Sequence, residues 1–416
     1  MPAKSDSNQI DELIFTAVFS ENEEGKLKAR ADIRELAQKQ GVISSSIYNY
    51  YMAIGSGKVP TGTTVPAINV RALTYDTARI IFRLMITKQI GPVIFEIAKS
   101  EIEYTTQRPD EYTTAVLAAA IKVGYKGPVF LQGDHFQFSQ KGYSEDPEGE
   151  INKIKTLIKE ALDGGFKNID IDASTLVDLS KPNQDEQQAE NYKVTSLLTS
   201  FVRSLEGGTT ISIGGEIGHI GGKNSNKREL EAFMNGYLEA IGTTKGISKI
   251  SVQTGTSHGG IPLPNGQIAE VKLDFEVIKK TGEVARNKYH IGGVVQHGAS
   301  TLPNDLFGEF PKHKTLEIHL ATGFQNIVFD NMSNDLREEI YAWLDENHQA
   351  EWDGALNHEQ NIYKTRKRAL GPFKKKLWEL SDKEKKPIIE NLEKQLTFLF
   401  EKLNVFNTKQ TLEQYV

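Results

Sequence analysis

The sequence contains no cysteine. Without thiols the chain cannot form disulfide bonds, and any bound metal must be held by histidine, aspartate or glutamate. No run of residues approaches the ~20 consecutive apolar residues that span a bilayer. The start of the chain, Met1-Pro-Ala-Lys-Ser-Asp-Ser-Asn-Gln9, lacks the apolar stretch of a secretory signal. These absences predict a protein of the cytoplasm.

An excess of charge of one sign is also missing. The 416 residues include 49 Lys+Arg and 55 Asp+Glu, which gives a formal net charge of −6 at pH 7. No basic excess indicates a nucleic acid or a membrane surface as partner, so we expect neither. A hydrophobic content of 38% and a charged content of 25% are ordinary for a folded globular protein. The length allows one large core with an appendage, or two domains.

The middle of the chain alternates β-like segments with helical patterns. The β-like segments are Val65–Val70, Pro92–Ile97, Pro128–Gly133, Asn168–Asp172, Thr209–Glu216, Ser248–Thr254, Tyr289–His297 and Phe324–Asp330. The helical patterns are Thr74–Lys88, Glu111–Val123, Glu148–Asp163, Gln188–Ser204, Lys227–Ile241 and Asp274–Thr281. Apolar runs such as Val-Ile-Phe-Glu-Ile are typical of strands buried on both faces. Alternating strands and helices predict a parallel sheet, and eight units predict an α/β fold of the (β/α)8 TIM-barrel class.

Two segments lie outside the barrel units. We expect a helical N-terminal extension over residues 1–60, the barrel over 61–333 and a helical C-terminal extension over 334–416. The C-terminal extension is heavily charged, for example in Lys364-Thr-Arg-Lys-Arg368, and carries apolar residues at helical spacing in Ile388–Leu403. A solvated helix face explains most of this charge. An oligomer contact or an anion-binding arm is the alternative.

Three histidines lie in glycine-flanked motifs at the ends of β-like runs. His135 follows Gly133-Asp134, His258 stands in Gly255-Thr-Ser-His-Gly-Gly260, and His297 stands in Gln296-His-Gly-Ala-Ser300. Because the carboxyl ends of barrel strands converge on one face, we expect the three side chains to meet. Three neutral imidazoles with a fourth position open form a catalytic zinc arrangement. Three unrelated polar residues in loops are the alternative.

The order of several short strings resembles the class II, metal-dependent ketose-bisphosphate aldolases, the fructose- and tagatose-bisphosphate group. The strings are Asp134-His135, Ile171-Asp-Ala-Ser174, Glu216-Ile-Gly218 with Gly221-Gly222, Gly255-Thr-Ser-His-Gly259 and His297-Gly-Ala-Ser300, within a resemblance that runs from Val65 to Asp330. It implies reversible cleavage of a phosphorylated ketose, foremost fructose 1,6-bisphosphate, to dihydroxyacetone phosphate and an aldehyde. It also implies zinc or another divalent transition metal as cofactor, and a monovalent cation could bind in the same region. We further expect a homo-oligomer, either a dimer or a tetramer.

The resemblance assigns roles to individual residues. The metal ligands would be His135, His258 and His297, with the carboxylates of Asp172 and Glu216 near a second or alternative metal position. A metal bound to the carbonyl and the adjacent hydroxyl of a ketose acts as a Lewis acid and stabilises the carbanion that cleavage leaves behind. Asp134 would be the acid/base that handles the C4 hydroxyl proton. Alternatively, Asp134 orients a metal-bound imidazole, and Asp172 caps the helix that follows it.

We expect glycine-containing turns to bind the phosphate of the substrate. Main-chain N–H groups at Gly222, Gly259 and Gly298 could approach an anion closely, and Ser300 could add a hydroxyl. Asp330 completes the expected substrate-binding set. An ordinary tight turn after a strand is the alternative at each glycine.

Two departures from the family pattern bear on the proton-transfer step and on the substrate. In the loop after Gly221-Gly222, Asn224 stands where the family has a catalytic glutamate, and an amide cannot act as a general base near pH 7. Glu229 is then the expected base, with Glu216 and His219 as alternatives, although Glu229 could also be a first-turn residue of the following helix. Near the eighth predicted strand, the family's Asn-x-Asp/Ala-Thr string corresponds to Val328-Phe-Asp-Asn331, so the family's asparagine is a valine.

These departures keep other functions open. They allow a sugar epimerase that cleaves and re-forms the bond, an aldolase for a different ketose, or a non-catalytic partner subunit. The histidines without a glycine context, namely His290, His313, His319, His348 and His358, are expected to be structural.

Overall fold

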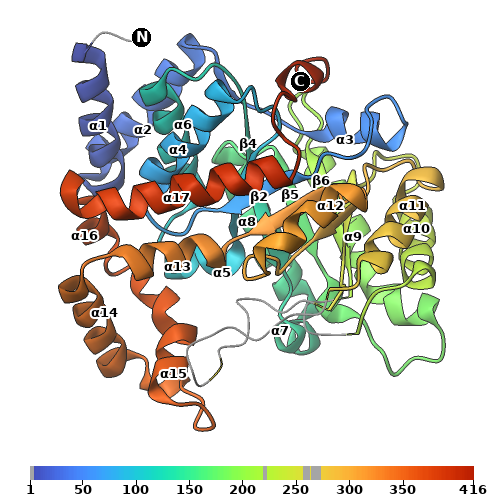
Figure 1. Ribbon diagram of the computed structural model, residues 1–416. Helices are drawn as coiled ribbons and strands as arrows, with labels where there is room; N and C mark the ends of the chain where they lie inside the picture. Colours follow the sequence, from blue (N-terminus) through green and yellow to red (C-terminus); the bar gives the residue numbers. More distant parts are fainter. Residues whose placement is uncertain (1–3, 219–222, 256–262, 264–272) are drawn as a thin grey trace.

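A closed ring of eight parallel strands forms the centre of the molecule (Figure 1). The computed structural model describes residues 4–218, 223–255, 263 and 273–416, with the side chains of 4–8 left out. The ring consists of β2 (Val65–Asn69), β3 (Ile94–Ala98), β4 (Gly127–Gln137), β5 (Asn168–Asp172), β6 (Ser212–Ile217), β7 (Lys249–Val252), β8 (Val294–Gln296) and β9 (Glu317–Leu320). Pairing of β2 with β9 and of β4 with β5 closes it. The predicted (β/α)8 barrel is therefore confirmed.

The eighth strand of the barrel is not the one that the sequence predicted. Phe324–Asp330 lies in helix α13 (Thr322–Asn331), and the strand is β9, a few residues earlier. Phe324, Val328 and Phe329 are buried at helical spacing, so the apolar run marks one face of a helix. The strand was missed because Glu317 and His319 interrupt its apolar pattern, although every residue of β9 is buried.

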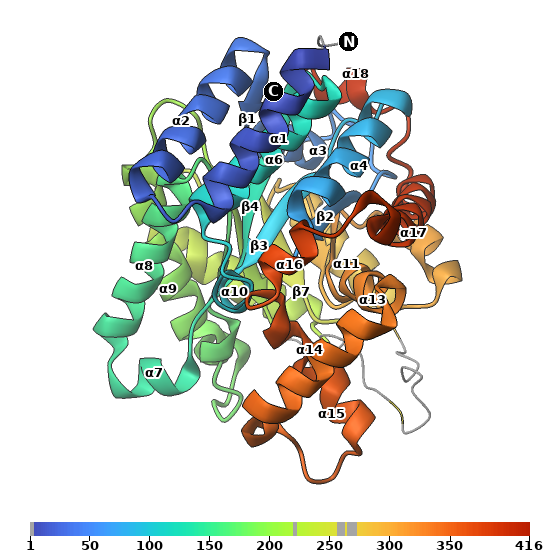
Figure 2. The same cartoon turned by 90° about the vertical axis from the view of Figure 1, so that its left-hand side faces the viewer.

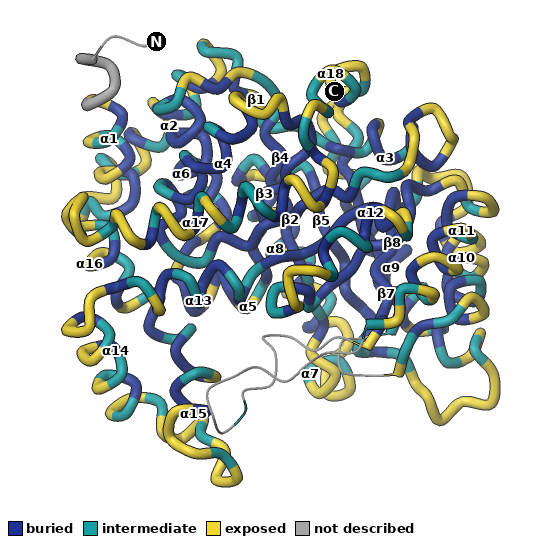
Figure 3. The backbone as a smooth tube through the Cα atoms, viewed as in Figure 1, coloured by how far each residue is buried: buried dark blue, intermediate teal, exposed yellow. Residues whose placement is uncertain are grey.

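Helices surround the barrel and largely match the predicted patterns. They are α4 (Thr74–Thr87), α5 (Lys99–Tyr104), α6 (Pro109–Val123), α7 (Gln140–Glu145), α8 (Pro147–Asp163), α9 (Gln184–Ser204), α10 (Lys227–Ile241), α11 (Phe275–Asn287), α12 (Glu309–Lys312) and α13. Local signals fix their starts: Pro147 occupies the first turn of α8, and the Asn183 side chain accepts a hydrogen bond from Glu186 N at the start of α9. Figure 3 shows the buried faces of the chain gathered around the barrel and the exposed residues on the outer surface.

The N-terminal extension contains a strand as well as helices. It comprises α1 (Lys4–Phe19), α2 (Glu23–Lys39), β1 (Val42–Ser44) and α3 (Tyr48–Gly55). β1 pairs in parallel with the start of β4, outside the closed ring. Helices α1 and α2 pack on α6 (Figure 2). Arg30 and Arg34 of α2 reinforce this contact with ion pairs of 2.8 and 2.5 Å to Asp110 of α6.

The C-terminal extension packs against the barrel at two places. It comprises α14 (Asn334–Asn347), α15 (His358–Thr365), the 3₁₀ turn Arg366–Leu370, α16 (Lys374–Trp378), α17 (Asp382–Lys402) and α18 (Lys409–Leu412). α17 packs against α4 and α13 and buries residues that recur every three or four positions, namely Ile388, Leu392, Leu396 and Leu399. The 3₁₀ turn packs on α5, next to the carboxyl end of β3. No helix of the described residues is sufficiently long and apolar to cross a membrane.

Candidate active site

A β-bulge in β4 places two of the expected site residues. The pairing register of β4 with β5 shifts between Gly133 and Phe136, and His135 adopts φ 42°, a left-handed conformation that a non-glycine residue rarely takes. Gly133 permits the bulge, because a Cβ there would lie 2.4 Å from the Phe136 ring. Asp134 and His135 are neighbours that would point to opposite faces of a regular strand. The bulge lets both line the same cavity.

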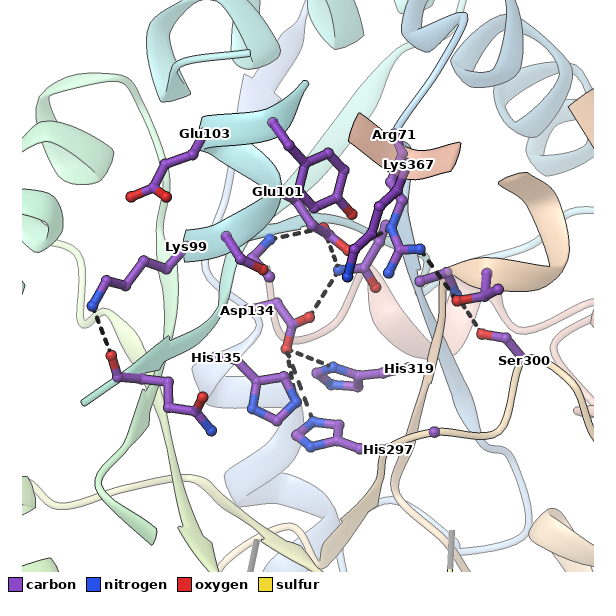
Figure 4. A pocket seen from close by; sticks show the side chains of 18 of the residues that line it. Arg71, Lys99, Glu101, Glu103, Asp134, His135, His297, Ser300, His319 and Lys367 are labelled. Atoms are coloured by element: carbon purple, nitrogen blue, oxygen red, sulfur yellow. Dashed lines mark hydrogen bonds and ion pairs between the residues drawn. The ribbon is translucent and has the colours of Figure 1, made fainter. Parts of the chain in front are cut away.

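Imidazoles from three parts of the chain meet at the carboxyl end of the barrel strands (Figure 4). The ring centroids of His135 and His297 are 3.9 Å apart, and those of His297 and His319 are 4.1 Å apart. His135 lies on β4, His297 directly follows β8, and His319 lies on β9. Strand ends that are far apart in sequence converge here because the barrel is closed.

Carboxylates surround this imidazole cluster. His135 Nδ1 lies 3.0 Å from Asp172 Oδ2 and 3.3 Å from Glu216 Oε2, and His297 Nδ1 lies 3.5 Å from Glu216 Oε2. Burial, and then the nearby charge of Asp172, raises the pKa of Glu216 to about 7. Asp172 also accepts hydrogen bonds from Ser174 N and Oγ. Asp172 therefore orients His135 and caps the turn after β5, whereas its expected place near a second metal position stays a prediction.

The donor set fits a divalent transition metal. His135, Glu216 and His297 each offer one ligand atom, and these atoms all lie within 4.8 Å of one another. Two imidazoles and a carboxylate suit zinc and similar ions. His258, the third expected imidazole, lies outside the described residues.

Asp134 is held between a neutral and a basic neighbour. Its Oδ2 accepts a hydrogen bond of 2.8 Å from Asn69 Nδ2, and its Oδ1 lies 3.0 Å from His319 Nδ1. Burial would raise the pKa of Asp134, but His135 and His319 outweigh burial and hold it well below the ordinary value. Asp134 is thus an ionised carboxylate with a fixed orientation at the cavity, which is the form that can accept a proton.

The cavity has a volume of about 560 Å³. Its lining includes the predicted residues Asp134, His135, Glu216, His297, Gly298 and Ser300. Gly298 has φ 69°, a conformation that favours glycine. Ser300 Oγ accepts a hydrogen bond of 2.6 Å from Ala321 N, which leaves its own hydrogen to donate into the cavity. Gly222 and Gly259, the other predicted phosphate-binding glycines, lie outside the described residues.

Comparison with protein-family profiles shows to which family the chain is related. Residues 60–379 match the family described as Fructose-bisphosphate aldolase class-II, which is well over half of the chain. The chain belongs to this family. Class II aldolases are metal-dependent and act on phosphorylated sugars, and the donor set at His135, Glu216 and His297 accords with that dependence. A comparison with curated protein sequences found no significant match.

Solved structures support the fold. A fructose-bisphosphate aldolase from Campylobacter jejuni is 18% identical with a TM-score of 0.51, and the alignment covers 88% of this chain and 97% of that one. The fructuronate-tagaturonate epimerase UxaE from Cohnella laeviribosi is 11% identical with a TM-score of 0.56, covering 92% and 85%. A probable tagatose 6 phosphate kinase from Sinorhizobium meliloti 1021 is 13% identical with a TM-score of 0.54, covering 85% and 99%. At these identities the likeness concerns the barrel fold.

The corrected eighth strand changes how this class II aldolase aligns with its family pattern. At the end of β9 the chain reads His319-Leu-Ala-Thr322, which fits the Asn-x-Asp/Ala-Thr string with histidine in place of asparagine. Val328, which the sequence placed there, is a buried residue of α13. His319, which the sequence led us to expect as a structural residue, lines the cavity together with the predicted site residues. The alternation of polar and apolar residues in Glu317-Ile-His-Leu320 was the signal that could have revealed it.

His319 joins the cavity to a charged layer inside the barrel. Its Nε2 lies 2.6 Å from Glu317 Oε1, and Glu317 forms an ion pair with Lys249 of β7. Lys249, only 1% exposed, also forms an ion pair of 3.0 Å with Asp170. Burial opposes the charged form of His319, but Glu96 and Asp134 outweigh burial and raise its pKa well above the ordinary value. Bulky branched residues dominate most barrel interiors, so this charged layer departs from the usual packing.

Of the predicted site residues that the structure describes, Asp172 stands behind His135 outside the cavity lining, and two others lie away from the site altogether. Asp330 lies on α13 with 65% of its side chain exposed and lies 3.7 Å from Arg366. Glu229 is in the first turn of α10, where it completes a capping box with Asn226 by accepting a hydrogen bond of 3.0 Å from Asn226 N. The structure therefore shows Glu229 as a first-turn residue of the helix, which was the alternative expected for it.

Proposed function

We propose that this chain is a metal-dependent aldolase that reversibly cleaves a phosphorylated ketose to dihydroxyacetone phosphate and an aldehyde. Fructose 1,6-bisphosphate is the ketose that the sequence leads us to expect. The observation that carries the proposal is the convergence of His135, Glu216 and His297 on the cavity that also holds Asp134. Membership in the class II aldolase family supports the same reaction type.

Zinc is the metal that we propose for the site. His135 and His297 would hold it with His258, and Glu216 stands close enough to supply an alternative ligand. In this position a divalent ion would supply Lewis-acid stabilisation of the negative charge left on the ketose fragment. The hydrogen bond from His135 Nδ1 to Asp172 fixes the ring, so that Nε2 is the nitrogen available for coordination.

Asp134 performs the proton transfer at C4. Its carboxylate takes the proton of the C4 hydroxyl as the C3–C4 bond breaks. C4 then becomes the aldehyde carbonyl, and the bonding electron pair stays on C3. In the reverse direction Asp134 returns this proton to the new alkoxide. The hydrogen bonds from Asn69 and His319 keep the carboxylate turned towards the cavity.

A second group must protonate C3 to release dihydroxyacetone phosphate. Glu229 was the first candidate, but its carboxylate is engaged at the start of α10. Glu216, unlike Glu229, lines the cavity, so we propose it for this step. His219 lies outside the described residues and stays a candidate. The phosphate would be held by Ser300 and the main chain at Gly298, with Gly222 and Gly259 completing the expected set.

Exchange of solvent deuterium into dihydroxyacetone phosphate tests the proposal, because it reports the C3 proton step alone. We expect the zinc-loaded protein to catalyse this exchange and to cleave fructose 1,6-bisphosphate in a coupled assay. Glu216→Gln should suppress exchange, whereas Glu229→Gln should retain it. Loss of exchange only in His219→Ala would assign the step to that residue. A zinc-loaded protein without any exchange would refute aldol cleavage through dihydroxyacetone phosphate.

A sugar epimerase that cleaves and re-forms the same bond is the second candidate. The observation that favours it is His319 at the position where the family string has asparagine, together with Asn224 in place of the loop glutamate. Both changes alter groups around the reacting carbons without altering the proposed metal ligands. Conversion of a ketose into its C4 epimer without release of dihydroxyacetone phosphate would distinguish the epimerase from the aldolase.

A further inference from the structure

The wall of the cavity carries basic side chains that the reaction described above does not use. Arg71 follows β2, Lys99 begins α5, and Lys367 belongs to the 3₁₀ turn of the C-terminal extension. Figure 4 shows Arg71 and Lys367 together on one side of Asp134, with His135 and His297 on the other. The charges of these three cations are neutralised to different degrees.

The charge of Arg71 is already neutralised. Its Nε donates a hydrogen bond of 2.6 Å to Glu101 Oε1, and the Glu101 side chain is only 3% exposed. Arg71 Nη1 donates to Thr322 and Gln325. Its Nη2 forms no hydrogen bond with any residue that the structure describes. Arg71 therefore offers one fixed donor without a net positive charge.

Lys99 is likewise engaged elsewhere. Its Nζ donates a hydrogen bond of 3.0 Å to the main-chain oxygen of Gln137 and lies 3.6 Å from Glu150. Glu103, the neighbouring acidic residue of the lining, is exposed to solvent. Lys99 is thus paired away from Arg71, and solvent screens the charge of Glu103.

Lys367 differs from Arg71 and Lys99 in how its charge is balanced. Within the described part of the chain it forms no ion pair with a carboxylate, and its Nζ lies over the Tyr104 ring, 5.7 Å from the centroid. Burial, and next the positive charge of Arg71, lowers the pKa of Lys367 below the ordinary value. An ammonium that is partly desolvated beside another cation is stabilised when an anion binds between them.

We propose that Lys367 and Arg71 bind the carboxylate of a ketose acid, at the end of the substrate remote from the metal. Glu101 balances the charge of Arg71. Lys367 is then the positive charge of this wall that pairs with no described carboxylate, and the single negative charge of a bound carboxylate would match it. A phosphate dianion would leave one negative charge uncompensated in a partly buried site. The free N–H of Arg71 and the Lys367 ammonium supply two donors for the two carboxylate oxygens.

This inference rests on the proposed function for the placement of the ketose and refines its substrate class. With the ketose carbonyl at the histidines, the far end of the sugar would reach the C-terminal extension. The terminal group of a hexulose would thus be a carboxylate, in place of the second phosphate of fructose 1,6-bisphosphate. It also gives the basic segment Lys364–Arg368 a binding role through one of its members, Lys367.

Calorimetric binding of three sugars to the zinc-loaded protein tests the subsite without any turnover. Fructose, fructuronate and fructose 6-phosphate differ only at C6, which carries a hydroxyl, a carboxylate or a phosphate. We expect fructuronate to bind about 10- to 100-fold more tightly than fructose, the range of a charge-assisted contact. Fructose 6-phosphate should bind no more tightly than fructuronate.

Variants at Lys367 test whether its ammonium causes the preference for fructuronate over fructose. Lys367→Met should reduce the ratio of fructuronate to fructose affinity by about tenfold or more, whereas Lys367→Arg should keep most of it. Lys364→Met is the matched control, because Lys364 is 49% exposed and lies 4.0 Å from Asp353, and it should leave the ratio unchanged. Circular dichroism and thermal unfolding would verify that each variant is folded.

The outcomes separate this inference from the proposed function. Equal affinities for fructuronate and fructose, or a preference that survives Lys367→Met, would overturn the subsite. Tighter binding of fructose 6-phosphate that is lost in Lys367→Met would overturn the carboxylate and assign a phosphate. Failure of deuterium exchange into dihydroxyacetone phosphate would refute the aldolase reaction, while the binding ratios would still decide on the subsite.

Discussion

Replacement of Lys249 by methionine should destabilise the barrel strongly. The Lys249 ammonium forms an ion pair of 3.0 Å with Asp170, pairs with Glu317 and donates a hydrogen bond of 2.8 Å to Gln132 Oε1. Methionine is similar in length, so Lys249→Met removes the charge and leaves two buried carboxylates without their main counter-charge. Removing one partner of a buried ion pair costs about 3–5 kcal/mol.

This cost converts into a measurable shift of the midpoint of thermal unfolding. An unfolding entropy of about 2.1 cal/mol/K per residue gives roughly 0.9 kcal/mol/K for a chain of this length. A loss of about 4 kcal/mol then lowers Tm by roughly 4–5 °C. Differential scanning calorimetry of the wild type and Lys249→Met would measure this shift.

Two further variants distinguish lost charge pairing from general damage to the core. Lys245→Met removes an exposed lysine near the start of the same strand and should change Tm by less than about 1 °C. The double variant Lys249→Met with Glu317→Gln removes one of the stranded carboxylates and should recover about half of the lost stability. A single variant as stable as the wild type, or a double variant no more stable than the single one, would refute the reasoning.

The other predictions concern the site itself. His135→Ala and His297→Ala should each abolish stoichiometric zinc binding while the barrel stays folded, as metal analysis and circular dichroism would show. Asp134→Asn should keep the metal and lower kcat by roughly 10²–10⁴-fold, the usual range for a positioned acid/base. His319→Asn should keep the metal but lower kcat by about tenfold, because Asp134 loses its hydrogen bond to His319. Burial would raise the pKa of Glu317, but Lys249 and His319 outweigh burial and lower this pKa from 4.5 to about 2. Because the pKa is depressed in the folded state, ionised Glu317 stabilises the fold above pH 4.5, and this stabilisation of about 3 kcal/mol is lost as the pH falls through about 2. Glu317→Gln should largely remove this change from the pH dependence of the free energy of unfolding.

Specific results would contradict these expectations. Full zinc occupancy in both histidine variants would show that the metal is held elsewhere. Loss of the metal in Asp134→Asn would favour a role for Asp134 in orienting the ligands, and loss in His319→Asn would make His319 a ligand. Identical acid unfolding profiles of the wild type and Glu317→Gln would show that the carboxylate is not ionised inside the barrel.

Local patterns were sufficient for most of the fold. Short buried strands and amphipathic helices have distinct periods, and caps such as Asn226 with Glu229 mark helix starts with residues that lie close in sequence. The patterns failed at β9, where Glu317 and His319 face the charged interior, and at Phe324–Asp330, whose apolar run is one face of a helix. β1 was missed because three residues carry too little pattern to indicate a strand.

The sequence by itself determined the alternation of strands and helices and the motifs that hold Asp134, His135 and His297, since each depends on residues within one segment. Only the tertiary structure decided which side chains from distant segments share the cavity. His319 acquires its partners across the barrel, and Lys367 reaches the wall from the C-terminal extension because the 3₁₀ turn packs on α5. The physical reason is that electrostatic and metal-binding contacts depend on distance in space, which the sequence specifies only through the folded packing of all its elements.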